Sequence, residues 1–134
     1  VLSLGNLEAQ RDWSDAEDFM EGVWLMLNQK GDPQNYILAS GEMHTVREFL
    51  EISLQVAGIE WYSRGTGDKE CFFHSPSGQL IFKINPKYYR PAEVHELCGD
   101  PTLVEAELGW KRKTNFYGLV EKMYHHDYKI VNNL

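Results

Sequence analysis

Hydrophobic positions recur with helical spacing near the start of the chain. A stretch from about Ser14 or Asp15 to Gln29 places its apolar residues at intervals of three and four, on one side of a helix: Ala16, Phe19, Met20, Val23, Trp24 and Leu27. Acidic residues crowd the start of this stretch, where negative charge favours the helix dipole: Asp12, Asp15, Glu17 and Asp18. The pattern predicts a helix whose apolar face is buried.

Three more helices are predicted from their end signals. Thr45 and Glu48 form a capping box, and the helix that follows ends at Gly58 with one apolar face: Val46, Phe49, Leu50, Ser53, Leu54 and Ala57. Asp100 is the expected N-cap of a helix that starts with Pro101 and runs to Leu108, before Gly109. Thr114 is the expected cap of the last helix, with Phe116, Leu119, Val120 and Met123 on one face.

Short apolar runs predict strands between these helices. They lie at residues 1–4, 36–39 and 59–62, and a hairpin is expected from 70–74 and 80–84 across the turn at 75–78. Helices and strands therefore alternate, with one hairpin inserted. We predict a mixed α and β (α/β) fold in a single region covering residues 1–134.

Composition and charge exclude several classes of protein. The 134 residues carry a net charge of -7, which argues against non-specific binding of nucleic acid. No apolar run is long enough for a membrane span and no signal peptide is visible, so we expect a cytoplasmic protein without a membrane partner. Cys71 and Cys98 match no zinc spacing and are expected to be reduced core thiols.

Arg11 is the first candidate for ligand binding. It follows a strand and the turn residues Gly5-Asn6, and it directly precedes the acidic start of the first helix. A guanidinium offers a rigid fork of donors that suits phosphate oxygens. The same arginine can instead pair with Glu8, Asp12 or Asp15 at this junction.

Arg90 is the second candidate. Pro91 restrains the backbone after it, and Tyr88 and Tyr89 offer flat faces that can hold a guanidinium or stack on a base or sugar. Glu93 has a carboxylate suited to the two vicinal hydroxyls of a ribose. Two arginines brought together would suit a diphosphate, whereas a surface salt bridge at the end of a tyrosine-rich strand is the simpler alternative.

No self-contained active site is visible. The sequence lacks a P-loop, G-x-S-x-G, H-E-x-x-H and the dinucleotide turn G-x-G-x-x-G. The adjacent His125 and His126 would point in different directions on a helix and could not share a metal ion. We therefore predict no catalytic, cofactor-binding or metal-binding residue in this chain.

Taken in order, these segments resemble the C-terminal portion of the GDP-mannose 4,6-dehydratases, a family of extended short-chain dehydrogenases/reductases. The resemblance covers nearly the whole chain and rests on several groups of residues: Leu4-Gly5-Asn6-Leu7, Arg11-Asp12-Trp13, Tyr36-Ile37-Leu38-Ala39-Ser40-Gly41-Glu42, His44-Thr45-Val46-Arg47-Glu48-Phe49, Lys87-Tyr88-Tyr89-Arg90-Pro91 with Glu93, and Leu108-Gly109-Trp110-Lys111.

The resemblance implies a specific role for the candidates. The family dehydrates GDP-mannose to GDP-4-keto-6-deoxymannose with NADP, which oxidises C4 of the hexose and later returns hydride to C6. By analogy Arg11 and Arg90 hold the diphosphate, and Glu93 holds the guanosine ribose. The NADP-binding Rossmann domain and the catalytic residues lie on an N-terminal part absent from this chain, so this chain alone is expected to bind no cofactor and to be inactive. A homo-oligomer is expected for the full-length protein.

The chain departs from the family pattern at Ser14 and Asp15, where the family has Gly and then His or an aromatic residue. It also lacks the Pro usual after Trp110-Lys111. Two other functions therefore remain open: a truncated, non-catalytic binding or assembly module, and a sibling dehydratase or epimerase that uses another nucleotide sugar.

Overall fold

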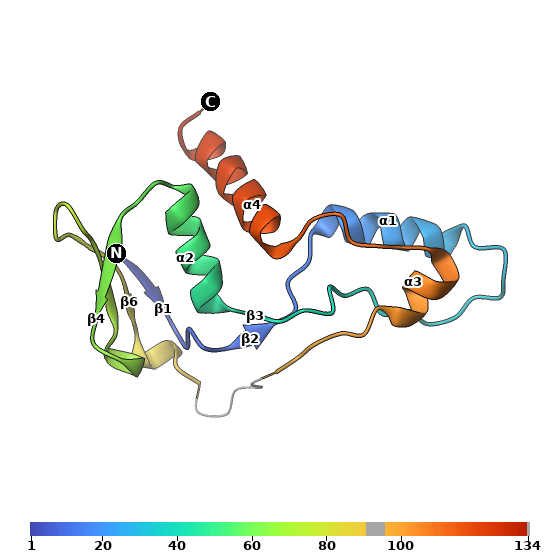
Figure 1. The fold of residues 1–134 in the computed structure, drawn as a ribbon, viewed down its shortest axis with the longest axis horizontal. Helices are drawn as coiled ribbons and strands as arrows, with labels where there is room; N and C mark the ends of the chain where they lie inside the picture. The colour runs from blue at the N-terminus through green and yellow to red at the C-terminus, as the bar shows by residue number, and fades with distance from the viewer. Residues whose placement is uncertain (91–95, 134) are drawn as a thin grey trace.

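The computed structural model describes residues 1–90 and 96–133. Its four-stranded sheet has the order β1 (Leu2–Leu4), β6 (Leu80–Ile84), β5 (Cys71–His74) and β4 (Trp61–Arg64). β1 runs parallel to β6, and the other neighbouring strands are antiparallel. The sheet lies at one end of an elongated molecule, with the N-terminus on β1 (Figure 1). The mixed α and β class predicted from the sequence is confirmed.

The strands of the sheet follow the predicted positions closely. The predicted hairpin is confirmed as β5 and β6, whereas the strand expected at 59–62 lies later, at Trp61–Arg64. The shift has a local cause, because the Ile59 N–H still donates to the Leu54 carbonyl, 2.9 Å away, at the end of the preceding helix. Gly58 reverses the chain there with φ 66°.

Helix α2 (Val46–Val56) begins with the predicted capping box. The Glu48 N–H donates to Thr45 Oγ1 at 3.0 Å, and the Thr45 N–H donates to Glu48 Oε2 at 2.7 Å. Leu54 of α2 is buried against the sheet, and Val46 and Leu50 pack beside it. This helix therefore covers one face of the sheet.

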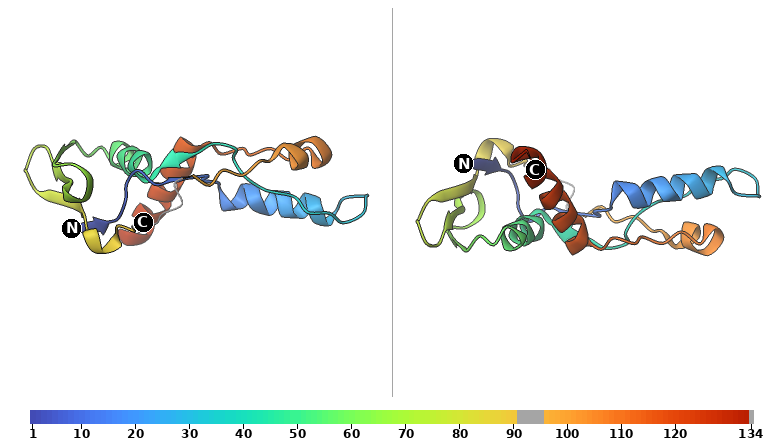
Figure 2. Two further views of the ribbon diagram at one scale, coloured as in Figure 1. Left: turned by 90° about the horizontal axis from the view of Figure 1, so that it is seen from below. Right: turned by 90° about the horizontal axis from the view of Figure 1, so that it is seen from above.

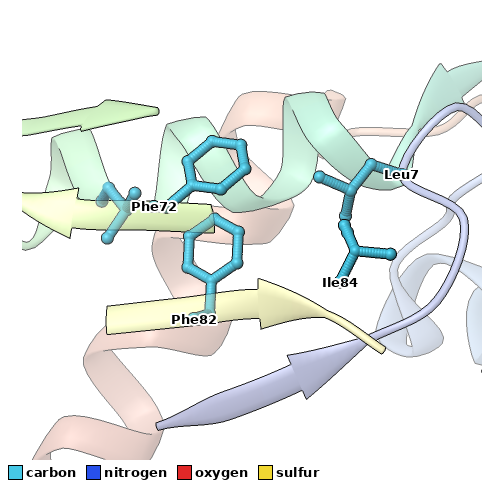
Figure 3. Close-up of a cluster of buried hydrophobic side chains, with 5 residues drawn as sticks. Leu7, Phe72, Phe82 and Ile84 are labelled. Atoms are coloured by element: carbon cyan, nitrogen blue, oxygen red, sulfur yellow. The ribbon is translucent and has the colours of Figure 1, made fainter. Parts of the chain in front are cut away.

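The core lies between α2 and the sheet. Phe72 and Phe82 come from adjacent strands, and their rings stack with centroids 4.0 Å apart. Leu7, from the segment after β1, and Ile84 close the other end of this cluster (Figure 3). The period-2 pattern of the hairpin thus places both phenylalanines on the buried face.

Helix α4 (Phe116–Val131) packs against α2 through aromatic rings. Phe116 lies 6.2 Å from Phe49 and 6.4 Å from Trp13, measured between ring centroids. The N-cap is Asn115, whose side chain accepts from the Gly118 N–H, so the prediction of Thr114 was wrong by one residue. Met123, expected on the buried face, is 45% exposed because the packed surface of α4 ends at Leu119 and Val120.

The other end of the molecule holds α1 (Ala16–Leu27) and α3 (Thr102–Leu108), in two layers with extended chain between them (Figure 2). Both helices were predicted. The N-cap of α3 is Pro101 and not Asp100, although the Asp100 side chain accepts from the Thr102 N–H at 3.0 Å. Gly109 ends α3 with φ 66°, as expected.

The face of α1 that turns inward differs from the prediction. Asp18 and Gly22 are its buried residues, whereas four of the apolar residues predicted to be buried are exposed: Met20, Val23, Trp24 and Leu27. The inward face is fixed by Trp110, whose Nε1–H donates to the Asp18 carbonyl at 2.8 Å. Periodicity found the helix but could not show which side packs within this chain.

Two more expectations were wrong. Residues 36–39 form no strand, and Ala39 lies against Gly99, where an added methyl group would be 2.3 Å from the Ala39 Cβ. Cys71 and Cys98 are free thiols but not core residues, since Cys71 is half-buried and Cys98 is exposed. The sequence also gave no signal for the short strands β2 (Gln10–Arg11) and β3 (His44–Thr45).

Candidate functional site

Arg11 is held in place by its backbone. β2 pairs antiparallel with β3, and Arg11 stands opposite His44 in this pairing. The side chain is half-buried, and its Nη1 donates to the carbonyl of Gln10 at 2.6 Å. Arg11 lies near the predicted junction of a strand and a helix, since α1 begins at Ala16, but it is the last residue of β2 and not a residue that follows the strand predicted at 1–4.

Arg90 lies at the end of the other candidate segment. The 3₁₀ helix η2 (Pro86–Tyr88) follows β6 and leads to Tyr89 and Arg90, and the side chains of Tyr88, Tyr89 and Arg90 are all exposed. The predicted ribose ligand, Glu93, lies outside the described residues. The roles of Arg11, Arg90 and Glu93 therefore remain predictions.

The segments that carry the two arginines meet at Gly5. The Asn85 N–H donates to the Leu4 carbonyl at 2.8 Å, which continues the pairing of β1 and β6 toward this point. A methyl group on Gly5 would lie 2.5 Å from the carbonyl oxygen of Tyr88. Only glycine permits this close backbone approach. The tertiary fold thus joins the stretch before Arg11 to the stretch before Arg90.

Arg47 fixes the loop between β1 and Arg11. Its guanidinium binds Glu70 with two hydrogen bonds of 3.0 and 2.7 Å, and its Nε–H donates to Glu8 at 2.7 Å. Its backbone N–H donates to the Leu7 carbonyl at 2.9 Å. A bidentate arginine–carboxylate pair specifies orientation as well as distance. A cavity of about 80 Å³ lies beside this network, lined in part by Gly5 and Tyr89.

The charges of this network stabilise one another. Glu70 is 7% exposed, and its hydrogen bonds from Arg47 lower its pKa although burial acts in the opposite direction. The pKa of Arg47 is raised, first by the hydrogen bonds to Glu70 and also by Glu8. A buried carboxylate therefore stays ionised because a fixed cation compensates it.

Asp12 holds three chain segments together beside Arg11. Its carboxylate accepts from the backbone N–H groups of Ser40 at 2.8 Å, Gly41 at 3.0 Å and Gly99 at 3.3 Å. Burial acts to raise its pKa, but the hydrogen bonds from the Ser40 side chain and from the three N–H groups together lower it. Asp12 was expected to interact with the helix dipole, and the structure gives it this cross-linking role.

The two departures from the family pattern have structural partners. Asp15 is the N-cap of α1, accepting from the Glu17 N–H at 2.8 Å, and its carboxylate also binds Lys122 of α4 at 2.8 Å. The hydrogen bond from Lys122 is the main reason that the pKa of Asp15 is lowered. The Ser14 hydroxyl lies 3.4 Å from Asp12 Oδ1. Asp15 therefore connects α1 to α4.

The described residues offer no candidate for a metal centre, since they contain no group of three or more His, Cys, Asp and Glu side chains that could hold a metal ion. Within the same ranges, no helix has the length and apolar character required to cross a membrane. Sequence reasoning named Asp12 as a helix-start acid and Arg47 only within a family segment, and it missed the contacts that both side chains make with distant parts of the chain.

Solved structures define the class of fold. The chain is similar to a UDP-glucose 4-epimerase from Thermotoga maritima with UDP-glucose, at TM-score 0.71 and 18% identity, over 97% of this chain and 35% of that one. It is also similar to the RMD structure from Pseudomonas aeruginosa complexed with NADPH, at TM-score 0.68 and 18% identity, over 92% and 34%. The chain thus has the fold of about a third of each of these two proteins.

Sequence comparison then identifies the family. The family profile described as GDP-mannose 4,6 dehydratase matches residues 1–123, and the chain belongs to this family. It is 41% identical to the GDP-mannose 4,6 dehydratase of Dictyostelium discoideum, over 99% of this chain and 37% of that protein. The human enzyme of the same name is 40% identical, over 97% and 35%. The chain thus spans little more than a third of these relatives.

Proposed function

We propose that this chain is the nucleotide-sugar-binding part of a GDP-mannose 4,6-dehydratase, which converts GDP-mannose to GDP-4-keto-6-deoxymannose. Arg11 and Arg90 would hold the diphosphate, and Glu93 would accept from the hydroxyls of the guanosine ribose. The observation that carries the proposal is the close approach of Gly5 to Tyr88, because it joins the two segments that present these arginines. The identity of the proposed substrate, GDP-mannose, is inferred from the family to which the chain belongs.

We expect this chain alone to bind no dinucleotide cofactor. The sequence contains no G-x-G-x-x-G turn, which the pyrophosphate of such a cofactor requires at the start of a helix. We therefore propose that NADP binds the N-terminal Rossmann domain that the chain does not span. The full-length protein is proposed to be a cytoplasmic homo-oligomer.

Calorimetric titration of the chain tests the proposal, with GDP, GDP-mannose, UDP and NADPH as ligands. We expect GDP and GDP-mannose to bind, and Arg90→Ala to weaken both. Since a hydrogen bond between charged groups contributes about 1.5–3 kcal/mol, the dissociation constant should rise roughly 10- to 150-fold. Arg64→Ala is the matched control, because Arg64 is also exposed but lies over the Tyr62 ring on β4.

The same titration separates the alternatives. Stronger binding of UDP than of GDP would favour a sibling epimerase or dehydratase, whose fold the neighbouring structures share. An Arg90→Ala variant that binds GDP as the parent chain does would contradict the proposed diphosphate site. Absence of nucleotide binding by the parent chain would favour an assembly module.

A further inference from the structure

The ring of His44 lies between two carboxylates. Its Nδ1 is 3.3 Å from Oε2 of Glu48 on α2, and its Nε2 is 3.8 Å from Oε2 of Glu42, which precedes β3. The side chain is 26% exposed, but Nε2 itself is buried and finds no hydrogen-bond partner among the described residues. A neutral imidazole carries one N–H, whereas an imidazolium carries two. Only the charged form of His44 therefore presents a proton to both carboxylates.

The other charged groups around the ring are also mainly acidic. Arg112, from the segment before α4, binds the Glu42 carboxylate. The hydrogen bond from Arg112 is the first cause that lowers the pKa of Glu42, and His44 adds to this effect. Glu51 of α2 brings a third carboxylate to the cavity of about 430 Å³ that His44 lines. A positive charge on His44 is thus compensated both from the segment before β3 and from α2.

The same ring joins β3 to the start of α4. It stacks on the ring of Phe116 with centroids 3.9 Å apart and an angle of 2° between the two planes. A cation over the face of an aromatic ring is attracted by the ring quadrupole. A charge on His44 therefore strengthens the contact with α4 as well as the contacts with the two carboxylates, and it holds β3 more firmly between α2 and α4.

β3 in turn positions Arg11. Arg11 stands opposite His44 in the antiparallel pair of β2 and β3, and side chains opposite each other in such a pair share one face, with Cβ atoms about 4.5–5.5 Å apart. The Trp13 Nε1–H donates to the His44 carbonyl at 3.2 Å. The backbone of His44 thus holds the strand that ends at Arg11 and the indole two positions further on.

We infer that His44 is a positioning residue for the proposed nucleotide-sugar site and that it acts by binding a proton. The inference rests on the proposed function, in which Arg11 holds the diphosphate. The charged ring fixes β3, and with it Arg11, and it offsets the negative charge of residues 42, 48 and 51 beside an anionic ligand. The diphosphate in turn relieves the repulsion between the imidazolium and Arg11. Both effects favour binding at lower pH, within the range of about pH 5–8 in which histidine usually changes charge.

Calorimetric titration of the chain with GDP-mannose tests the inference. GDP is unsuitable, since its terminal phosphate itself changes charge near about pH 6, whereas the diphosphate of GDP-mannose is esterified at both ends. We expect GDP-mannose to bind at least about fivefold more tightly near pH 6 than near pH 8. We also expect binding to take up protons, which is measured as a difference between the heats in Hepes and in Tris buffer.

Substitution of the histidine shows whether this proton dependence belongs to His44. His44→Gln keeps a polar side chain that does not titrate, and it should lose both the pH dependence and the proton uptake. His74→Gln is the matched control and should keep both. His74 is also partly buried, but it lies on β5 with its Nδ1 2.7 Å from Ser77 Oγ.

NMR spectra of the unsubstituted chain give a second measurement that needs neither ligand nor variant. The amide of Arg11 and the indole N–H of Trp13 should shift between about pH 6 and 8, because both groups are joined to β3. The indole N–H of Trp24, which is 64% exposed on α1, is the internal control and should not shift.

The outcomes separate the inference from the proposed function. The inference is overturned, and the proposed function stands, if the chain binds GDP-mannose equally at both pH values or if His44→Gln keeps the pH dependence. It is also overturned if the Arg11 and Trp13 signals do not respond to pH. If the chain binds no GDP-mannose at either pH, the proposed function fails and the inference fails with it.

Discussion

Individual side chains in this molecule act mainly by connecting segments that are distant in sequence. Asp12 receives N–H groups from residues 40, 41 and 99, and Arg47 joins Glu8 to Glu70. Both residues neighbour the loop or strand that leads to Arg11. Charged groups near the candidate site thus determine the shape of the site as well as its electrostatic potential.

The Asp12 carboxylate makes stability depend on pH. Its pKa is lowered in the folded chain from the usual 3.8, so its contribution is present above about pH 4 and is lost as the pH falls through the folded value. Asp12→Asn should cost about 1–2 kcal/mol at neutral pH, because an amide offers fewer acceptor sites to the three N–H groups. Urea unfolding should also show a smaller loss of stability on acidification than in the parent chain. Asp32→Asn, on an exposed loop, is the control. If acidification lowered the free energy of unfolding equally in Asp12→Asn and in the parent chain, the Asp12 carboxylate would not be the source of the pH dependence.

Removing the Arg47 side chain should leave a buried charge without its partner. We expect Arg47→Met to lower the free energy of unfolding by about 2–3 kcal/mol, less than for a fully buried pair because part of Arg47 is exposed. Arg47→Met combined with Glu70→Leu should recover much of this loss. Denaturant unfolding of both variants measures the difference, and a double variant less stable than Arg47→Met would show that packing, not charge, dominates.

At the scale of elements, close backbone approaches decide how the helices and strands fit together. Gly22 permits α1 to lie against Leu38 and Trp110, and Gly5 permits the end of β1 to lie against Tyr88. The hydrophobic pattern identifies such elements but carries no information on these contacts. Their partners lie far along the chain, and glycine contributes nothing to the periodicity.

Gly5→Ala should disturb both stability and binding. The added methyl group would lie 2.5 Å from a backbone oxygen, which cannot move away as a side chain would. We expect a loss of about 1–3 kcal/mol in unfolding free energy together with weaker binding of GDP. Gly31→Ala is the control, since no atom lies within 4 Å of its added methyl group, and it should change stability by less than about 0.5 kcal/mol. If a folded Gly5→Ala variant bound GDP as the parent chain does, the contact between Gly5 and Tyr88 would not be needed for the proposed nucleotide site.

At the scale of the whole molecule, the elements gather at two ends. The sheet, α2 and the segments around Gly5 form the end proposed to bind the nucleotide sugar, whereas α1 and α3 form the opposite end (Figure 1). We expect the purified chain to show no dehydratase turnover of GDP-mannose with added NADP, because the cofactor-binding turn is not in its sequence. A coupled assay for the 4-keto product measures this, with the human relative as the positive control. Turnover by the chain alone would contradict the proposal that NADP binds a part of the protein that this chain does not span.

The sequence by itself determined the class of fold, the existence and approximate bounds of the four α-helices, the hairpin and the family. These features depend on short-range patterns: the 3.6-residue period, the capping box at Thr45 and the left-handed glycines Gly58 and Gly109. Only the tertiary structure decided the orientation of α1, the absence of a strand at residues 36–39 and the cross-links made by Asp12 and Arg47. Each of these depends on partners between about 20 and 90 positions away, such as Trp110 for Asp18 and Gly99 for Asp12. An apolar residue is recognisable from the sequence, but the surface that covers it depends on the whole assembled fold.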